Sequence, residues 1–145
     1  MHTDRVLMYQ DDLDAALDAL LTMVRPGGRL VAFEFDYGSL ILDHGSGNPA
    51  AVRAVEGLLE RSLPQPRAGR RLPSILAARG LAVTAEPLAV GADVTVFRRI
   101  IGDTVRAAGG DADPVVRRWL AHAESGAVPL PVAVTGVLTT ATVAG

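Results

Sequence analysis

The sequence predicts an α/β fold in which helices cover a largely parallel sheet. Three features between residues 5 and 36 support this class: an amphipathic helix, a sharp glycine-containing turn, and a dense apolar strand that follows directly. A strand without polar and apolar alternation is typical of one covered on both faces, which favours a central position in a parallel sheet. Together the three features form the αβ unit of a doubly wound domain.

The helix is predicted over residues 13–24 because its apolar residues recur at helical spacing. They share one stripe of the helix: Leu13, Ala16, Leu17, Leu20, Leu21 and Val24. Either Asp11 or Asp12 can cap it. An aspartate there accepts a backbone N–H of the first turn, and its charge suits the positive end of the helix dipole.

A turn ends this helix and leads at once into the strand over residues 30–33. Pro26 has no N–H to continue the helix, and Gly27 and Gly28 can adopt the positive φ of a sharp reversal. The strand ends in polar residues: Glu34, Asp36 and Tyr37. Because ligands of such sheets collect at the carboxyl ends of strands, we expect the chemistry of the protein there.

The remaining elements follow from local signals. Residues 37–49 have loop composition, and Pro49 can open a helix that runs to about residue 63. Another helix is predicted over residues 71–79, ending at Gly80, and a strand over residues 81–90 that Pro87 bends or bounds. Helices over residues 96–108 and 114–124 and a final strand over residues 128–143 complete the pattern.

Composition excludes several classes of function. The net charge of −2 and the dispersed arginines argue against nucleic acid as a partner, and no apolar run is long enough to cross a membrane. The absence of cysteine excludes disulfides and thiol chemistry. His2, His44 and His122 lack metal-ligand spacing, so no metal site is expected. Without a signal-peptide pattern, a cytoplasmic location is expected.

Several motifs together resemble one enzyme family. They are Asp4-Arg5-Val6-Leu7, Asp11-Asp12, Arg25-Pro26-Gly27-Gly28, Glu34-Phe35-Asp36, Gly69-Arg70-Arg71-Leu72-Pro73, Ala77-Ala78-Arg79-Gly80-Leu81 and the final Val- and Thr-rich run. The chain resembles the second half of class I S-adenosylmethionine-dependent methyltransferases of the small-molecule type. The resemblance implies a partial Rossmann-like sheet of late strands, including an antiparallel closing strand, with flanking helices.

The resemblance also implies that residues 1–145 form a single partial domain that lacks the N-terminal, cofactor-binding half. Members of the family cradle S-adenosylmethionine with a glycine-rich turn after their first strand. The glycines of this chain at positions 45 and 47 do not follow such a strand and predict a loop instead. We therefore expect the chain to be incomplete as a catalyst alone.

By the same resemblance, the cofactor lies near Arg5, Val6 and Leu7, and Tyr9 faces the mouth of the active site. A salt bridge to Asp4 or Asp11 is the alternative for Arg5, and an aromatic lid on the helix is the alternative for Tyr9.

Candidate residues for the methyl acceptor follow the strand that ends at Asp36. Asp36 is the candidate catalytic group, as a base or as an electrostatic partner of the cationic sulfonium, and a loop cap is its alternative. Glu34 is the weaker candidate, with pairing to an arginine as its alternative. Three further residues are candidate substrate ligands: Tyr37, His44 and Arg70. A solvated loop position is the alternative for His44 and an exposed helix position for Arg70.

Two functions remain open from the sequence. The first is methyl transfer to a small-molecule acceptor, with a homodimer or a complementing polypeptide as partner. The second is a non-catalytic binding or assembly module that pairs through an exposed sheet edge, that of the strand ending at Asp36. S-adenosylmethionine binding separates the two.

Overall fold

The computed structural model describes residues 1–42, 48–91, 94–125 and 132–145. The elements follow in this order: β1 (His2–Asp4), the short 3₁₀ helix η1 (Leu7–Tyr9), α1 (Leu13–Thr22), β2 (Arg29–Leu42), α2 (Pro49–Arg61), α3 (Ala68–Ala78), β3 (Ala82–Gly91), α4 (Val94–Ala107), η2 (Gly110–Ala112), α5 (Pro114–Ser125) and β4 (Val132–Thr142). They divide into two units. Unit 1 comprises Met1–Gly38, Leu63–Ala89 and Thr135–Gly145, and unit 2 comprises Ser39–Ser62 and Val90–Val134.

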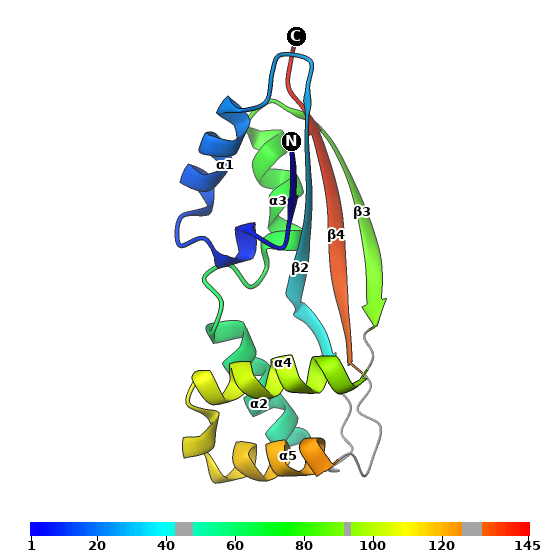
Figure 1. Cartoon of the computed structure of the whole chain (residues 1–145). Coiled ribbons are helices and arrows are strands. Elements are labelled where there is room, and N and C mark those ends of the chain that lie inside the picture. Colours follow the sequence, from blue (N-terminus) through cyan, green and yellow to red (C-terminus); the bar gives the residue numbers. More distant parts are fainter. Residues whose placement is uncertain (43–47, 92–93, 126–131) are drawn as a thin grey trace. The chain divides into compact units, whose positions relative to one another are not determined.

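The strands form one four-stranded sheet in the order β1-β2-β4-β3. β1 and β2 are parallel, with His2 opposite Val31 and Asp4 opposite Phe33. β4 runs antiparallel to its two neighbours, β2 and β3 (Figure 1). The predicted α/β class and the central position of the strand predicted to end at Asp36 are therefore confirmed, since β2 has a neighbour on each side. The prediction of a largely parallel sheet is wrong, because β1 and β2 form the one parallel pair among the described strands and β4 is antiparallel to both of its neighbours.

Unit 1 has its own apolar core, between one face of the sheet and the helices α1 and α3, which lie on the same side of it (Figure 1). Leu13 and Leu17 of α1 meet Leu30 of β2 and Leu72 of α3 in this core. The predicted stripe of α1 is thus its buried face. The predicted cap is Asp12, whose carboxylate accepts the Ala15 N–H at 2.9 Å.

Unit 2 is formed mainly by α2, α4, η2 and α5, which pack around a second apolar core. Trp119 of α5 is its largest side chain, and Val55 of α2 and Val105 of α4 are fully buried. Asn48 caps α2 through hydrogen bonds from the N–H groups of Ala50 and Ala51. Pro49 opens that helix as predicted.

The prediction of a loop over residues 37–49 is wrong at its start, because β2 continues to Leu42. The polar and glycine residues of this stretch indicated a loop, but Leu40 and Leu42 pack into the core of unit 2 and extend the strand. The sequence also predicted that the strand ending at Asp36 has an exposed edge, and this prediction is wrong. β2 lies inside the sheet, and the sheet edges belong to β1 and β3.

The remaining elements lie close to their predicted positions. α3 begins at Ala68, before the predicted residue 71, because Gly69 allows its first turn to approach β2. Pro87 lies within β3, as an edge strand permits. The predicted prolines at the start of the last strand, at positions 129 and 131, fall outside the described residues.

The turn between α1 and β2 uses its two glycines differently from the prediction. Gly27 alone has a positive φ, of 71°. Gly28 is required for space, because a Cβ there would lie 2.7 Å from the carbonyl oxygen of Arg25 and 3.0 Å from a methyl group of Val24. We therefore expect Gly28→Val to destabilise unit 1 by steric conflict with the backbone, by about 2 kcal/mol or more.

Gly27→Ala is the matched comparison, because a Cβ at this position meets no atom within 4 Å and only the positive φ opposes it. Its cost should stay near 1 kcal/mol. Urea denaturation followed by circular dichroism measures both variants. Equal losses in the free energy of unfolding of the two variants would show that steric crowding is not the reason why a glycine is needed at position 28.

Candidate functional site

The carboxylate of Glu34 is buried in unit 1 and binds the segment that follows β1. Its Oε1 accepts the backbone N–H groups of Val6 at 3.0 Å and Leu7 at 2.8 Å, and its Oε2 accepts that of Met8 at 3.2 Å. Glu34 is 0% exposed. Burial raises the pKa of Glu34, and the three hydrogen bonds oppose that rise. The sequence suggested two roles for Glu34: proton transfer or pairing with an arginine. Neither role describes this arrangement.

This anchor places Arg5 at the carboxyl end of β1 in a strained conformation. Its φ is 52°, the one positive value among the described residues other than glycine. The Arg5 N–H donates to the carbonyl of Phe33 at 2.8 Å, which extends the pairing of β1 with β2 by one residue. The guanidinium donates to Asp4 at 2.9 Å and lies 5.7 Å from the centre of the Phe35 ring.

Aromatic side chains extend from Arg5 along one face of β2. Phe33, Phe35 and Tyr37 alternate with Glu34 and Asp36, and each aromatic ring meets the next edge to face. Burial raises the pKa of Tyr37. The nearby Tyr9 raises it further, and Arg5 opposes the rise. The predicted residues Arg5, Tyr9 and Tyr37 therefore influence one another electrostatically. Tyr9 itself is 58% exposed.

The opposite face of β2 carries an ion pair between two predicted residues. Nε of Arg70 donates to Oδ2 of Asp36 at 2.5 Å, and Oδ1 of Asp36 accepts the N–H of Gly38 at 3.1 Å. The Asp36 side chain is 7% exposed, whereas that of Arg70 is 49% exposed. The sequence proposed the two as separate candidates, and the structure joins them.

Gly69 makes this pairing sterically possible. A Cβ on Gly69 would lie 2.6 Å from the carbonyl oxygen of Glu34 and 3.0 Å from the carbonyl carbon of Phe35. The first turn of α3 therefore rests directly on the backbone of β2, and Arg70 follows in that turn. A glycine at a helix start was the only sequence signal for this close approach.

The other predicted cofactor residues have distinct surroundings. Val6 is 46% exposed, whereas Leu7 is buried in the core of unit 1. The N–H groups of both residues are bound to Glu34. Arg5 and the Val6 side chain are consequently the parts of this segment that a ligand can reach. His44 lies outside the described residues.

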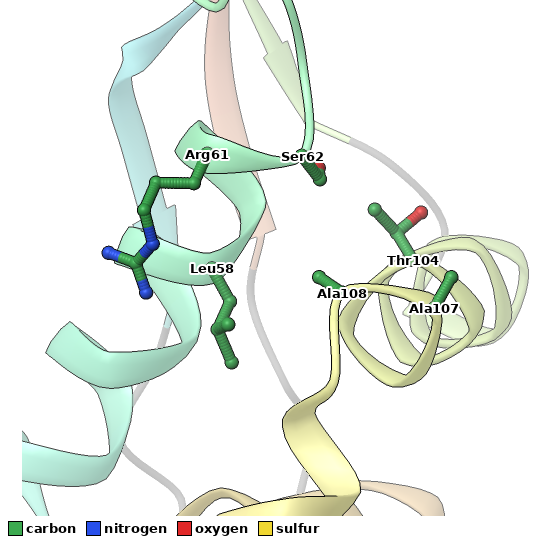
Figure 2. Close-up of a pocket in the computed structure, with 6 residues that line it drawn as sticks. All are labelled: Leu58, Arg61, Ser62, Thr104, Ala107 and Ala108. Atoms are coloured by element: carbon green, nitrogen blue, oxygen red, sulfur yellow. The ribbon is translucent and has the colours of Figure 1, made fainter.

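The two described cavities lie away from these residues. One, of 570 Å³, lies at the amino end of β2, beside Arg25 and Arg29. The other, of 410 Å³, lies in unit 2 and is lined by residues from the end of α2 and the end of α4: Leu58, Arg61, Ser62, Thr104, Ala107 and Ala108 (Figure 2). Both helices present their partly negative carboxyl ends there, and Arg61 is in the last turn of α2.

Neither a metal-binding cluster nor a membrane-spanning helix occurs among the described residues. No group of three or more histidine, aspartate or glutamate side chains has an arrangement that could hold a metal ion. None of the helices in the described part of the chain combines the length and the apolar character that crossing a bilayer requires.

Comparison with known proteins identifies a fold relative. No protein-family model and no curated protein matches the chain. Among solved structures, the chain is similar to the YcgJ protein from Bacillus subtilis, with a TM-score of 0.58 and 12% sequence identity. The match covers 99% of this chain and 63% of that chain, so this chain spans less than two thirds of that protein's length. At this identity the similarity concerns the fold alone.

Removing the Glu34 carboxylate should destabilise unit 1 strongly. Glu34→Ala leaves the N–H groups of Val6, Leu7 and Met8 without their acceptor, and we expect a loss of about 3 kcal/mol in the free energy of unfolding. Chemical denaturation at pH 7 measures this loss. A loss below about 1 kcal/mol would mean that water satisfies these groups equally well.

The pH dependence of stability should report the same group. Because the pKa of Glu34 is raised on folding, the unfolded chain loses this proton first, and the free energy of unfolding should fall as pH rises from 4.5 to the raised pKa. Glu34→Gln should remove this part of the pH dependence. An unchanged profile in that variant would contradict the assignment.

The ion pair between Asp36 and Arg70 should respond asymmetrically to mutation. Arg70→Ala removes the guanidinium partner of a buried carboxylate and should cost about 2 kcal/mol, whereas Asp36→Ala leaves a half-exposed guanidinium and should cost about 1 kcal/mol or less. Thermal denaturation of both single variants and the double variant gives the coupling energy. The reverse order of stability would show that Asp36 does not depend on Arg70.

Proposed function

We propose that the chain forms the C-terminal part of an S-adenosylmethionine-dependent methyltransferase that acts on a small molecule. The order of strands is the observation that carries this proposal. β1, β2 and β3 run in the same direction, and β4 lies between β2 and β3 in the opposite direction (Figure 1). Late strands of a doubly wound sheet are parallel neighbours, so β4 corresponds to the antiparallel closing strand that the family resemblance implies.

The residues that follow the carboxyl end of β1 fit the amino-acid end of the cofactor. Arg5 holds a half-exposed guanidinium at this edge, and such a group binds a carboxylate through a rigid fork of donors. Val6 adds an exposed apolar surface beside it. When bound, the cofactor supplies a methyl group already activated on a sulfonium.

The protein's own contribution in this proposal is alignment and proton acceptance. Tyr9 and Tyr37 orient the methyl acceptor by hydrogen bonds from their phenol groups. Asp36 accepts the proton of the nucleophile, and Arg70 fixes the orientation of that carboxylate through the contact at 2.5 Å. The glycine-rich turn of the family comes, in this proposal, from a segment outside these 145 residues, in the same or a separate polypeptide.

A non-catalytic assembly module is the second candidate, and one observation favours it. β1 lies at an edge of the sheet, with β2 as its one neighbour among the described strands. Its backbone N–H and C=O groups on the side away from β2 could pair with an added strand. The catalytic proposal also expects a neighbour here, so cofactor binding decides between the two.

Isothermal titration calorimetry with S-adenosylmethionine tests the catalytic proposal. We expect the chain extended by its in-frame upstream residues to bind with a Kd within the range of about 1 μM to 1 mM typical of enzyme substrates, and the 145-residue chain to bind at least about tenfold more weakly. Arg5→Ala in the extended protein should weaken binding about tenfold, the loss of one charge-assisted contact.

Arg25→Ala is the matched control, because Arg25 is an exposed arginine in the turn before β2, at the other end of that strand. It should leave the Kd unchanged. Absence of binding by the extended protein, or equal effects of the two substitutions, would overturn the proposal.

A further inference from the structure

Arg5 adopts a backbone conformation that is unfavourable for a residue with a side chain. Its φ of 52° lies in the left-handed region, where a Cβ comes too close to the following carbonyl oxygen. The other described residues with a positive φ are glycines, in which this conflict does not arise: Gly27, Gly80 and Gly109. Strained positions of this kind concentrate at functional sites, where the surrounding structure holds them in place. An arginine at such a position therefore indicates a role for its side chain that glycine could not fill.

Hydrogen bonds to two residues of β2 fix the chain at Arg5 and directly after it. The Arg5 N–H donates to the carbonyl of Phe33 at 2.8 Å, which continues the pairing of β1 with β2. The next three N–H groups donate to the side chain of Glu34 instead, at distances of 3.0, 2.8 and 3.2 Å, and they belong to Val6, Leu7 and Met8. The chain must change direction between these two sets of hydrogen bonds, and the positive φ of Arg5 makes this change.

The same turn orients the guanidinium of Arg5 while leaving it open to solvent. Its Nε and Nη2 donate to the Asp4 carboxylate at 2.9 and 3.4 Å, and its central carbon lies 5.7 Å from the centre of the Phe35 ring. The side chain is nevertheless 53% exposed. A guanidinium has five N–H groups, so donors remain for a further acceptor. A cation that is already oriented loses little conformational freedom when an anion binds to it, and this strengthens the binding.

We propose that Glu34 is a positioning residue, which holds Arg5 at positive φ and so orients its guanidinium for the carboxylate of the cofactor before the cofactor binds. Glu34 itself contacts neither the cofactor nor the methyl acceptor in this role. Its buried hydrogen bonds offset the strain at Arg5. The control of Arg5 by Glu34 does not depend on a ligand, whereas the identity of the ligand rests on the proposed function.

Glycine and alanine at position 5 measure the strain. Both variants, Arg5→Gly and Arg5→Ala, lose the guanidinium, but only glycine also loses the Cβ that opposes a positive φ. We expect the midpoint of urea denaturation to be higher for Arg5→Gly, by about 0.5 M. The same two substitutions at Arg25 are the control, because Arg25 is exposed and its φ is not positive. There alanine should give the higher midpoint, since glycine has more conformational freedom to lose on folding.

The Glu34→Gln variant tests whether Glu34 imposes this strain. Its amide has one acceptor oxygen in place of two, so it cannot bind all three N–H groups equally well. In this background the difference in urea midpoint between glycine and alanine at position 5 should fall to less than about half. The one-bond Cα–Hα coupling constant of Arg5, which depends on the sign of φ, should move toward the value of a negative φ. Asp12→Asn is the control, because Asp12 also accepts a backbone N–H of unit 1, and it should change neither measurement.

The consequence for the cofactor is measured in the protein extended by its upstream residues. Glu34→Gln should weaken S-adenosylmethionine binding about threefold to tenfold, and adding Glu34→Gln to Arg5→Ala should weaken it no further, because Glu34 acts through Arg5. Additive losses of affinity in the double variant would overturn the positioning role. Where Glu34→Gln does not fold, Glu34→Asp replaces it, since its shorter side chain keeps the charge but cannot reach all three N–H groups at once.

The outcomes distinguish this inference from the proposed function. If the extended wild-type protein does not bind S-adenosylmethionine, the proposed function fails, and the comparison at position 5 still decides whether Glu34 controls Arg5. Equal urea midpoints for Arg5→Gly and Arg5→Ala would overturn the inference even if the cofactor binds. A difference that persists unchanged in the Glu34 variants, with an unchanged coupling constant at Arg5, would overturn it as well.

Discussion

The hydrogen bonds between the Glu34 carboxylate and the N–H groups of Val6, Leu7 and Met8 constrain the geometry of unit 1. Three donors are satisfied by one buried side chain, so the chain must leave β1 at one defined point. The positive φ of Arg5 is part of the same turn, and the surrounding contacts hold the strain of this conformation. Residues after β1 and residues of β2 are thereby brought to one edge of the sheet.

Two glycines determine what the other face of β2 can present. Gly69 removes the atom that would separate α3 from β2, and Gly38 leaves room for the side chains of Arg70 and Asp36, which a Cβ at this position would crowd. Asp36 and Arg70 become partners only because of this approach, although 34 residues separate them in the sequence. The buried Asp36 carboxylate holds the Arg70 guanidinium in one orientation. Because that guanidinium is half-exposed, it can also contact a ligand.

The two faces of β2 therefore have different chemistry. Arg5, Phe35 and Tyr37 form an aromatic and cationic surface on one face, and Asp36 with Arg70 forms a polar pair on the other. The strand alternation that separates them is a direct consequence of β geometry.

Local signals in the sequence determined most of the secondary structure. Apolar spacing predicted α1, the proline and glycine turn predicted the start of β2, and the absence of alternation predicted that β2 is internal. These predictions succeed because neighbouring residues decide helix periodicity, caps and turns.

The tertiary structure alone decided the end of β2, the environment of Glu34 and the partner of Asp36. Leu40 and Leu42 extend the strand because they pack into a core built from residues far along the chain. A glutamate that binds backbone N–H groups 26–28 residues away leaves no local pattern, and neither does a glycine whose missing Cβ permits contact with another element. Such contacts depend on where distant segments meet, which spacing along the sequence does not specify.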